Sequence, residues 1–134
     1  MTPADLAATH ALCFTTPRPW KAQEFQTLLD SARVRLFGGS NAFLMVRTIL
    51  DETEVLTLAT HPDHRRTGQA RALLAQLHDT VQGRVFLEVA ANNIAAQTLY
   101  KQAGYKVDGR RKDYYRHPDG SRVDALLMAR TLGN

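Results

Sequence analysis

A short basic loop at residues 64–71 combines the residue types that best bind an anion. Three arginines surround Gly68, between an apolar run at 55–60 and an amphipathic segment. The apolar residues of that segment recur at helical spacing, which predicts a helix with Asp63 or Thr67 as its N-cap. Free N–H groups at a helix N-terminus bind anionic oxygens, and a glycine lets a ligand approach the backbone closely. The loop is therefore a candidate phosphate site, with an ordinary basic connection as the alternative.

Glu88 is a carboxylate within an otherwise apolar predicted strand at 84–90. Alternation places Val85, Leu87 and Val89 on one face of that strand and Glu88 on the other. A carboxylate on a strand covered on both faces is costly unless it is hydrated, paired or used. Partial burial makes a carboxyl group hold a proton more readily, so Glu88 is a candidate general base. A glutamate exposed at the rim of the sheet is the alternative.

Tyr100 follows on the apolar face of a predicted helix that ends near Ala103. A phenol has an ordinary pKa of about 10 and can donate a proton to a departing thiolate. Tyr100 is therefore a candidate general acid, a role compatible with that of a core aromatic whose hydroxyl reaches water. We expect Asn92 to cap this helix, whereas Asn93 could cap it or reach a ligand.

Length and composition indicate one globular domain over residues 1–134, because 134 residues with 44% hydrophobic content fit a single core. No apolar run is long enough to cross a bilayer and no leader pattern is present, so we expect a cytoplasmic monomer. The lone Cys13 excludes an internal disulfide, and the histidines show no metal-ligand spacing. The net charge of +4 favours an anionic ligand without identifying it.

The remaining patterns predict a mixed α/β fold. We expect helices at 3–14 and 20–31, then strands at 33–37, 42–50 and 55–60, the basic loop with its helix to about 81, a strand at 84–90, a helix to 103, and a final hairpin of strands at 105–115 and 122–130. An antiparallel meander followed by a strand–helix–strand unit packs as one mixed central sheet with helices on both faces.

In this order the motifs resemble the GNAT acetyltransferase superfamily, and within it the bacterial ribosomal-protein-alanine N-acetyltransferases. The pyrophosphate loop of that superfamily has the pattern Gln/Arg-x-x-Gly-x-Gly/Ala, which residues 65–70 match. The resemblance covers nearly the whole chain from about residue 14. It rests further on Pro19-Trp20, Leu50-Asp51-Glu52, residues 59–70, Leu87-Glu88-Val89, residues 93–100, Ala103-Gly104-Tyr105, Arg110-Arg111 with Tyr114-Tyr115, and residues 124–128.

The resemblance implies a GNAT-like fold, acetyl-CoA as co-substrate and no metal. It implies transfer of an acetyl group to the N-terminal α-amine of a protein, most simply a ribosomal protein that starts with alanine. Glu88 would be the proton acceptor and Tyr100 the proton donor. The residues implied to bind the cofactor are Leu58, Ala59, Thr60, Arg66, Thr67, Gly68, Gln69, Ala70, Arg71 and Asn93.

The acceptor contacts are expected to come from Trp20, Glu52 and Tyr114. Each has a structural alternative, as a helix anchor, a solvated turn residue and a strand aromatic respectively. The chain departs from the family pattern in having Arg65 for Gln, Ala70 for Gly, Lys21 for Ser, Val123 for an acidic residue, and one extra residue between Arg111 and Tyr114. The last two lie near the expected acceptor groove, so they affect the identity of the acceptor more than that of the cofactor.

Other classes of function stay open, because the fold does not determine the acceptor. One alternative is a GNAT enzyme that acts on a small-molecule amine or another protein. A second is a non-catalytic acyl-CoA-binding module, against which the presence of both Glu88 and Tyr100 argues. A third is a nucleic-acid-binding domain, but aromatic and basic residues do not alternate along any segment. We therefore expect no direct contact with nucleic acid or membrane.

Overall fold

The computed structural model describes residues 1–14 and 18–133. Two helices, α1 (Pro3–Cys13) and α2 (Ala22–Leu29), precede three strands, β1 (Val34–Gly39), β2 (Ala42–Ile49) and β3 (Glu52–Thr60). A short 3₁₀ turn, η1 (Pro62–His64), leads to α3 (Gln69–Thr80). The chain then forms β4 (Gly83–Ala90), α4 (Ile94–Gln102), β5 (Lys106–Arg116) and β6 (Arg122–Leu132).

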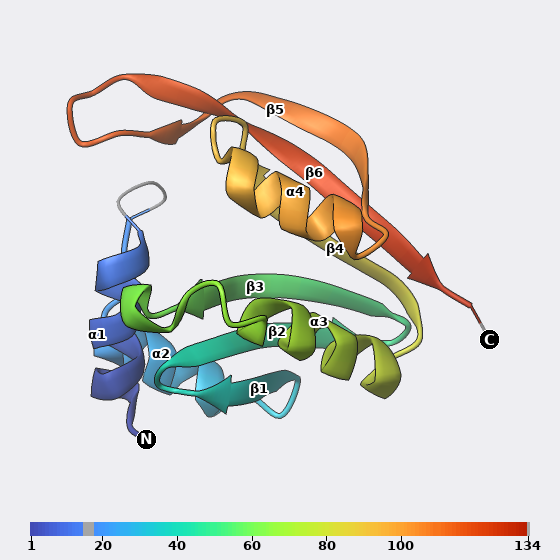
Figure 1. Ribbon diagram of the computed structural model, residues 1–134, viewed down its shortest axis with the longest axis horizontal. Helices are drawn as coiled ribbons and strands as arrows, with labels where there is room; N and C mark the ends of the chain where they lie inside the picture. The colour runs from blue at the N-terminus through green and yellow to red at the C-terminus, as the bar shows by residue number, and fades with distance from the viewer. Residues whose placement is uncertain (15–17, 134) are drawn as a thin grey trace.

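The six strands form one sheet in the order β1-β2-β3-β4-β6-β5. All neighbours are antiparallel except β3 and β4, which run parallel and pair only where Glu52–Glu54 face Arg84–Phe86. Past these residues β4, together with β6 and β5, turns away from β3 (Figure 1). The sheet is therefore split between Val55–Thr60 and Leu87–Ala90.

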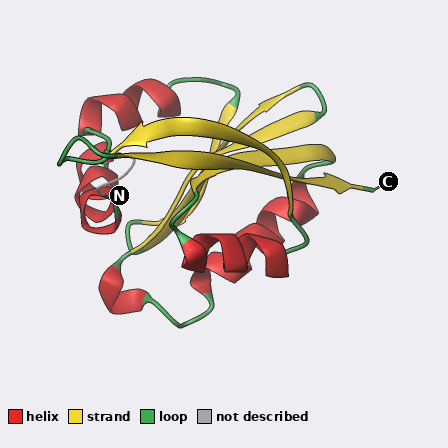
Figure 2. Ribbon diagram, turned by 90° about the horizontal axis from the view of Figure 1, so that it is seen from above, coloured by secondary structure: helices red, strands yellow, loops and turns green. Residues whose placement is uncertain are grey.

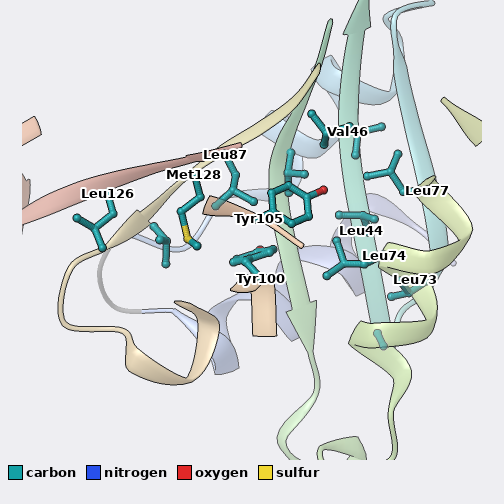
Figure 3. Close-up of a cluster of buried hydrophobic side chains, with 14 residues drawn as sticks. Leu44, Val46, Leu73, Leu74, Leu77, Leu87, Tyr100, Tyr105, Leu126 and Met128 are labelled. Atoms are coloured by element: carbon teal, nitrogen blue, oxygen red, sulfur yellow. The ribbon is translucent and has the colours of Figure 1, made fainter. Parts of the chain in front are cut away.

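Helices cover both faces of the sheet (Figure 2). On one face α1 and α2 pack against Phe43 and Met45 of β2, and on the other α3 packs against Leu44 and Val46 in a core that Tyr100 of α4 joins. This division follows from the alternation of side chains along a strand. Figure 3 shows the second core, which gathers Leu44, Val46, Leu73, Leu74, Leu77, Leu87, Tyr100, Tyr105, Leu126 and Met128.

The fold class is as the sequence predicts, and the differences concern element ends. The strand predicted at 55–60 begins at Glu52, because β2 and β3 pair up to the tight turn at Leu50 and Asp51. The polar run Glu52–Glu54 gives no apolar signal, yet Thr53 is buried and its hydroxyl bonds to that of Thr48.

The predicted helix caps are wrong in two places. Neither Asp63 nor Thr67 caps α3, since Gly68 is its N-cap in the left-handed conformation without a side-chain hydrogen bond. Asn93 rather than Asn92 caps α4, and its Oδ1 accepts from the N–H of Ala96 at 3.1 Å. Because Asn93 is the cap, α4 begins at Ile94, one residue later than a cap at Asn92 would give. Asn93 also lines the cavity described below.

Candidate active site

A cavity of about 600 Å³ lies where β3 and β4 separate. Residues 55–60 of β3 line one side of it and residues 87–90 of β4 line the other. The basic loop and the first turn of α3 close one end, and residues of α1 and α4 complete the wall. The split in the sheet therefore forms a groove that reaches from the predicted anion site to Glu88 and Tyr100.

The basic loop presents backbone donors and positive charge to this cavity. Gly68 has φ +79°, which L residues with a Cβ rarely adopt, and α3 starts there with no capping side chain and no acidic residue in its first turn. The first N–H groups of α3 are thus not satisfied by a cap and suit the oxygens of a phosphate. Arg66 also has a left-handed backbone, with φ +65°.

Some side chains of the basic loop make hydrogen bonds that hold the loop in place, and others line the cavity. Arg65 Nε donates to the carbonyl oxygen of Thr60 at 3.2 Å, and the hydroxyl of Thr67 donates to the carbonyl oxygen of His64 at 2.7 Å. Arg71 Nη2 donates to Gln102 Oε1 at 3.2 Å and so ties α3 to α4. Of the predicted loop contacts, Arg66, Gly68, Gln69, Ala70 and Arg71 line the cavity, and Thr67 does not.

The strand β3 offers an unpaired backbone edge to the cavity. Leu58, Ala59 and Thr60 all line it, at the part of β3 that has lost its β4 neighbour. Just before them the register with β2 shifts, so that Met45 faces Thr57 and the adjacent Val46 faces Val55. This bulge leaves an extra residue, Leu56, in β3. An extended ligand with amide groups can bond to the edge in place of a neighbouring strand.

Glu88 lies in the middle of β4 rather than at the rim of the sheet, and its side chain is 23% exposed. Its carboxylate lines the cavity, and its Oε1 is 3.4 Å from Nε of Arg111. Tyr115 lines the same part, where burial and the charge of Glu88 raise the pKa of the phenol to about 12. The half-buried carboxylate thus has one cation and one neutral phenol near it.

Tyr100 lies in the core and also lines the cavity. Its ring packs edge-on against Tyr105 in the core, and the residue is 7% exposed. Its hydroxyl makes no hydrogen bond within the described residues. Every fully buried side-chain oxygen there has a partner, so this hydroxyl is not fully buried, and it opens to the cavity that Tyr100 lines. Burial raises the pKa of Tyr100 above its ordinary value, which keeps the phenol protonated at neutral pH.

Of the three residues expected to contact the acceptor, one lines the cavity and the other two do not. Trp20 lines the cavity and stacks on His10 at a centroid distance of 5.1 Å. Tyr114 does not line it, and its half-exposed ring lies under the guanidinium of Arg111. Glu52 lies at the closed end of the β3–β4 split, with its Oε1 3.7 Å from Arg84. Glu52 does not line the cavity, because its pairing with β4 places it where the two strands are still joined, and its role toward an acceptor stays a prediction.

Sequence reasoning missed several cavity residues, namely His10, Cys13, Phe14, Thr57 and Tyr115. His10 and Cys13 follow Leu6 at four and seven residues, so all three share one face of α1. That spacing was a usable signal for an inward histidine. Within residues 1–14 and 18–133, no group of His, Cys, Asp or Glu side chains could hold a metal ion, and no helix there is long and apolar enough to span a membrane.

The fold and the cavity define a class, an α/β domain whose split sheet suits an extended ligand that carries phosphate. The comparison with known families makes this specific. The chain belongs to the Acetyltransferase (GNAT) family, whose model matches residues 9–105.

Two curated relatives show how far the likeness extends. The chain is 40% identical over 96 residues to the [Ribosomal protein bS18]-alanine N-acetyltransferase of Escherichia coli (strain K12), a match that covers 69% of this chain and 64% of that protein. The chain thus spans less than two thirds of that relative. It is 33% identical over 138 residues to the N-alpha-acetyltransferase RimI of Mycobacterium tuberculosis, which covers 96% of this chain and 85% of the relative.

Solved structures agree with the fold. The crystal structure of the ribosomal-protein-S18-alanine N-acetyltransferase from Escherichia coli has a TM-score of 0.87 at 29% identity, and the match covers 98% of this chain and 88% of that one. Arabidopsis thaliana NAA60 in complex with a bisubstrate analogue has a TM-score of 0.80 at 22% identity, with 98% and 94% covered. The second likeness concerns the fold alone.

Proposed function

We propose that this chain transfers an acetyl group from acetyl-CoA to the N-terminal α-amine of a protein, and that the acceptor is a ribosomal protein that starts with alanine. One observation carries the proposal. Glu88 and Tyr100, a carboxylate and a protonated phenol, line the same cavity as the anion-binding loop. The names of the bacterial relatives, which are alanine N-acetyltransferases of ribosomal protein bS18, support the choice of acceptor.

The residues present fit acetyl-CoA, which supplies the activated acetyl thioester. Gly68, Gln69, Ala70 and the side chains of Arg66 and Arg71 would hold the diphosphate, because they combine N–H donors with positive charge. The open edge of β3 at Leu58–Thr60 would bond to the amides of the pantetheine arm. Asn93, whose Oδ1 is used by the α4 cap, would offer its amide NH₂.

The proton transfers follow from the two side chains. An α-amine has a pKa of about 7.7–8.0, so at neutral pH it must lose a proton before it attacks a carbonyl carbon. Glu88 would accept this proton, directly or through a water. Tyr100 would donate its proton to the sulfur as the carbon–sulfur bond breaks, because its phenol remains neutral until then.

The protein backbone and the groove supply the rest of the rate. A backbone N–H from Leu58–Thr60 would stabilise the charge that develops on the carbonyl oxygen. Holding two substrates in line is worth up to about 7–11 kcal/mol. The acceptor would enter between Trp20 and the hairpin of β5 and β6, where Tyr115 lines the cavity. All these groups belong to one chain, so we propose a monomer as the active form.

The test is a measurement of CoA release from acetyl-CoA with a short peptide that copies an alanine-initiated ribosomal N-terminus. Mass spectrometry then locates the acetyl group, and we expect it on the α-amine. A peptide blocked at its N-terminus and a polyamine serve as controls. Turnover of the polyamine alone would discard the peptide acceptor and keep the acetyltransferase. Acetyl-CoA binding without turnover of any amine would discard the catalytic assignment.

A further inference from the structure

His10 is a fully buried histidine whose two ring nitrogens are both engaged. It extends from α1 with 1% exposure and lies against Phe14, Trp20 and Phe25. Its Nδ1 is 3.1 Å from the backbone nitrogen of Trp20, and its Nε2 is 2.9 Å from Oγ1 of Thr57. His10 therefore connects the segment between α1 and α2 to the bulged part of β3.

The contact with Trp20 determines where the ring carries its proton. A backbone N–H can only donate, so Nδ1 of His10 accepts and carries no hydrogen. Burial lowers the pKa of His10 to about 4, so the ring is neutral at working pH and its one hydrogen is on Nε2. Nε2–H must then donate to Oγ1 of Thr57.

The direction of that bond leaves the Thr57 hydroxyl with its own hydrogen unused. Oγ1 accepts from His10, and the hydroxyl makes no other hydrogen bond to any described residue. Thr57 lines the cavity. A buried hydroxyl is most stable when its hydrogen finds an acceptor, and a substrate in the cavity that Thr57 lines can supply one.

Thr57 also lies where the reaction is expected to occur. It precedes Leu58–Thr60 on β3 and contacts α1 through His10. Across the split, Val85, Leu87 and Val89 face α3 and α4, so Glu88 points to the face that α1 and α2 cover. Thr57 and Glu88 therefore extend from opposite sides of the groove toward the same face of the sheet.

We propose that the Thr57 hydroxyl donates a hydrogen bond to a carbonyl oxygen of the bound substrates, and that His10 is the positioning residue that fixes the direction of this donor. The inference rests on the proposed acetyl transfer. The carbonyl belongs either to the acyl group or to the main chain of the acceptor, and kinetics separate the two. No covalent step is assigned to either side chain.

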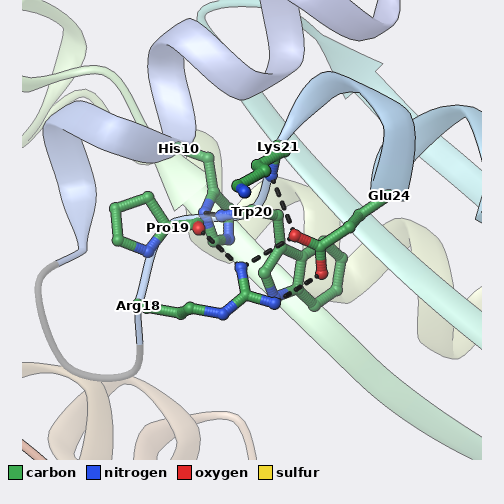
Figure 4. A network of polar contacts seen from close by, with 6 residues as sticks. All are labelled: His10, Arg18, Pro19, Trp20, Lys21 and Glu24. Atoms are coloured by element: carbon green, nitrogen blue, oxygen red, sulfur yellow. Dashed lines mark hydrogen bonds and ion pairs between the residues drawn. The ribbon is translucent and has the colours of Figure 1, made fainter.

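Further contacts hold the segment that presents the Trp20 N–H to His10. The bidentate pair of Arg18 with Glu24, at 2.7 and 2.9 Å, and the bond from the Lys21 N–H to Glu24 at 3.1 Å hold the segment that carries Trp20 (Figure 4). The Trp20 N–H thus stays directed at His10. Because the ring cannot take the other tautomer without losing this bond, the donor at Thr57 has one direction only.

The decisive experiment compares Thr57→Val, which keeps the shape of the side chain, with Thr57→Ser, which keeps the hydroxyl. We expect Thr57→Val to lower kcat/KM for the peptide by about tenfold, as the loss of one neutral hydrogen bond would, and Thr57→Ser to retain most of it. A fall in kcat with unchanged KM values assigns the acyl carbonyl. A rise in the peptide KM alone assigns the acceptor carbonyl.

His10→Asn tests the positioning role, because its amide oxygen can still accept from Trp20 but its side chain no longer reaches Thr57. We expect it to lower kcat/KM in the wild type and to add no further loss in the Thr57→Val background. Nitrogen NMR of the His10 ring should show hydrogen on Nε2 in the wild type. A hydrogen on Nδ1 would overturn the inference whatever the kinetics show.

Three further outcomes are distinguishable. If the wild type acetylates the peptide and Thr57→Val does so at the same kcat and KM, the inference about Thr57 is wrong and the proposed function stands. If Thr57→Ser loses as much as Thr57→Val, the hydroxyl is not the cause and the inference is again wrong. A wild type that acetylates no amine contradicts the proposed function, and the inference falls with it.

Discussion

The guanidinium of Arg111 reaches across β6 to within 3.4 Å of the Glu88 carboxylate. Arg111 pairs with Ala125 of β6, whereas Glu88 pairs with Leu127 of the same strand, so the contact runs diagonally over β6. The guanidinium also lies 5.2 Å from the ring centre of Tyr114. The edge strand β5 thus places a positive charge beside the candidate base. A change in the position of the β5–β6 hairpin would therefore change the charge that Glu88 experiences, through Arg111.

Arg111→Ala should lower acetyl transfer without unfolding the protein. The side chain is half exposed, so its ion pair contributes at most about 1 kcal/mol to stability. Its loss leaves Glu88 without a fixed partner, and we expect kcat to fall by about tenfold. Steady-state kinetics and thermal melts check this. Arg116→Ala removes the same charge from an exposed position on β5 and should change neither. Equal losses in both variants would mean a general charge effect.

Glu88→Gln should remove most of the transfer activity and leave acetyl-CoA binding intact. An amide keeps the size of the side chain but cannot take a proton, and general-base catalysis is worth about 10²–10⁴-fold. Single-turnover rates and calorimetric titration with acetyl-CoA measure the two quantities separately. Retention of the wild-type rate would show that another group accepts the proton.

Tyr100→Phe and Tyr105→Phe form a matched pair. The Tyr100 hydroxyl has no protein partner within the described residues, so its removal should lower kcat by 10-fold or more with little change in melting temperature. The Tyr105 hydroxyl bonds to His78 Nε2 at 2.8 Å in the core, so its removal should cost about 1 kcal/mol of stability and spare kcat. The opposite result for the two variants would place the acid elsewhere.

Gly68→Ala tests the anion loop against an equivalent glycine. Gly68 and Gly120 have φ of +79° and +89°, and a Cβ at either meets no atom within 4 Å. Both substitutions should therefore cost about 1–2 kcal/mol of backbone strain. Only Gly68→Ala should also weaken acetyl-CoA binding, by about tenfold or more, since it changes the first turn of α3. Calorimetry would contradict this if the two variants bound acetyl-CoA alike.

The buried His10 predicts a fall in stability at mildly acid pH. Burial lowers its pKa in the folded state to about 4, from 6.5, so the unfolded chain binds the proton first. The neutral His10 ring contributes fully to the free energy of unfolding above about pH 6.5. This contribution is lost as the pH falls through about 4, and the total loss is up to about 3 kcal/mol. The lowered pKa of His78 acts in the same direction.

Urea unfolding at several pH values between about 7 and 4 measures this dependence, and His10→Asn should flatten the curve in that range. A wild-type stability that stays constant over the same range would show that folding does not lower the pKa of His10.

The sequence predicts those parts of the fold that depend on local periodicity. The stripe of Leu73, Leu74 and Leu77 determines α3, and the alternation around Glu88 determines which face of β4 it occupies. The helix caps were harder, because Gly68 caps α3 through its backbone conformation and leaves no side-chain signature. The proposed roles of Glu88 and Tyr100 come from the resemblance to a family, because the residues alone left them open.

Long-range contacts account for what the sequence could not predict. From the sequence, Glu52 is expected to contact an acceptor. In the structure it pairs with Arg84 across β3 and β4, a contact between strands that no local pattern predicts. The elements α2, β1 and β2 lie between His10 and Thr57 in the sequence, and only the packing of α1 on β3 brings the two residues together. The diagonal approach of Arg111 to Glu88 depends on the order of β4, β6 and β5, which no local pattern contains.

The brief parallel pairing of β3 and β4 has a mechanical consequence. Three residue pairs join one half of the sheet, β1 to β3, to the other half, β4 to β6. A ligand that hydrogen-bonds to the open edges of both β3 and β4 would supply the contacts that these two strands lack beyond their three paired residues, and it would connect the two halves of the sheet. Because such a ligand binds only where the two edges are held in their folded arrangement, its binding would stabilise the whole chain against unfolding.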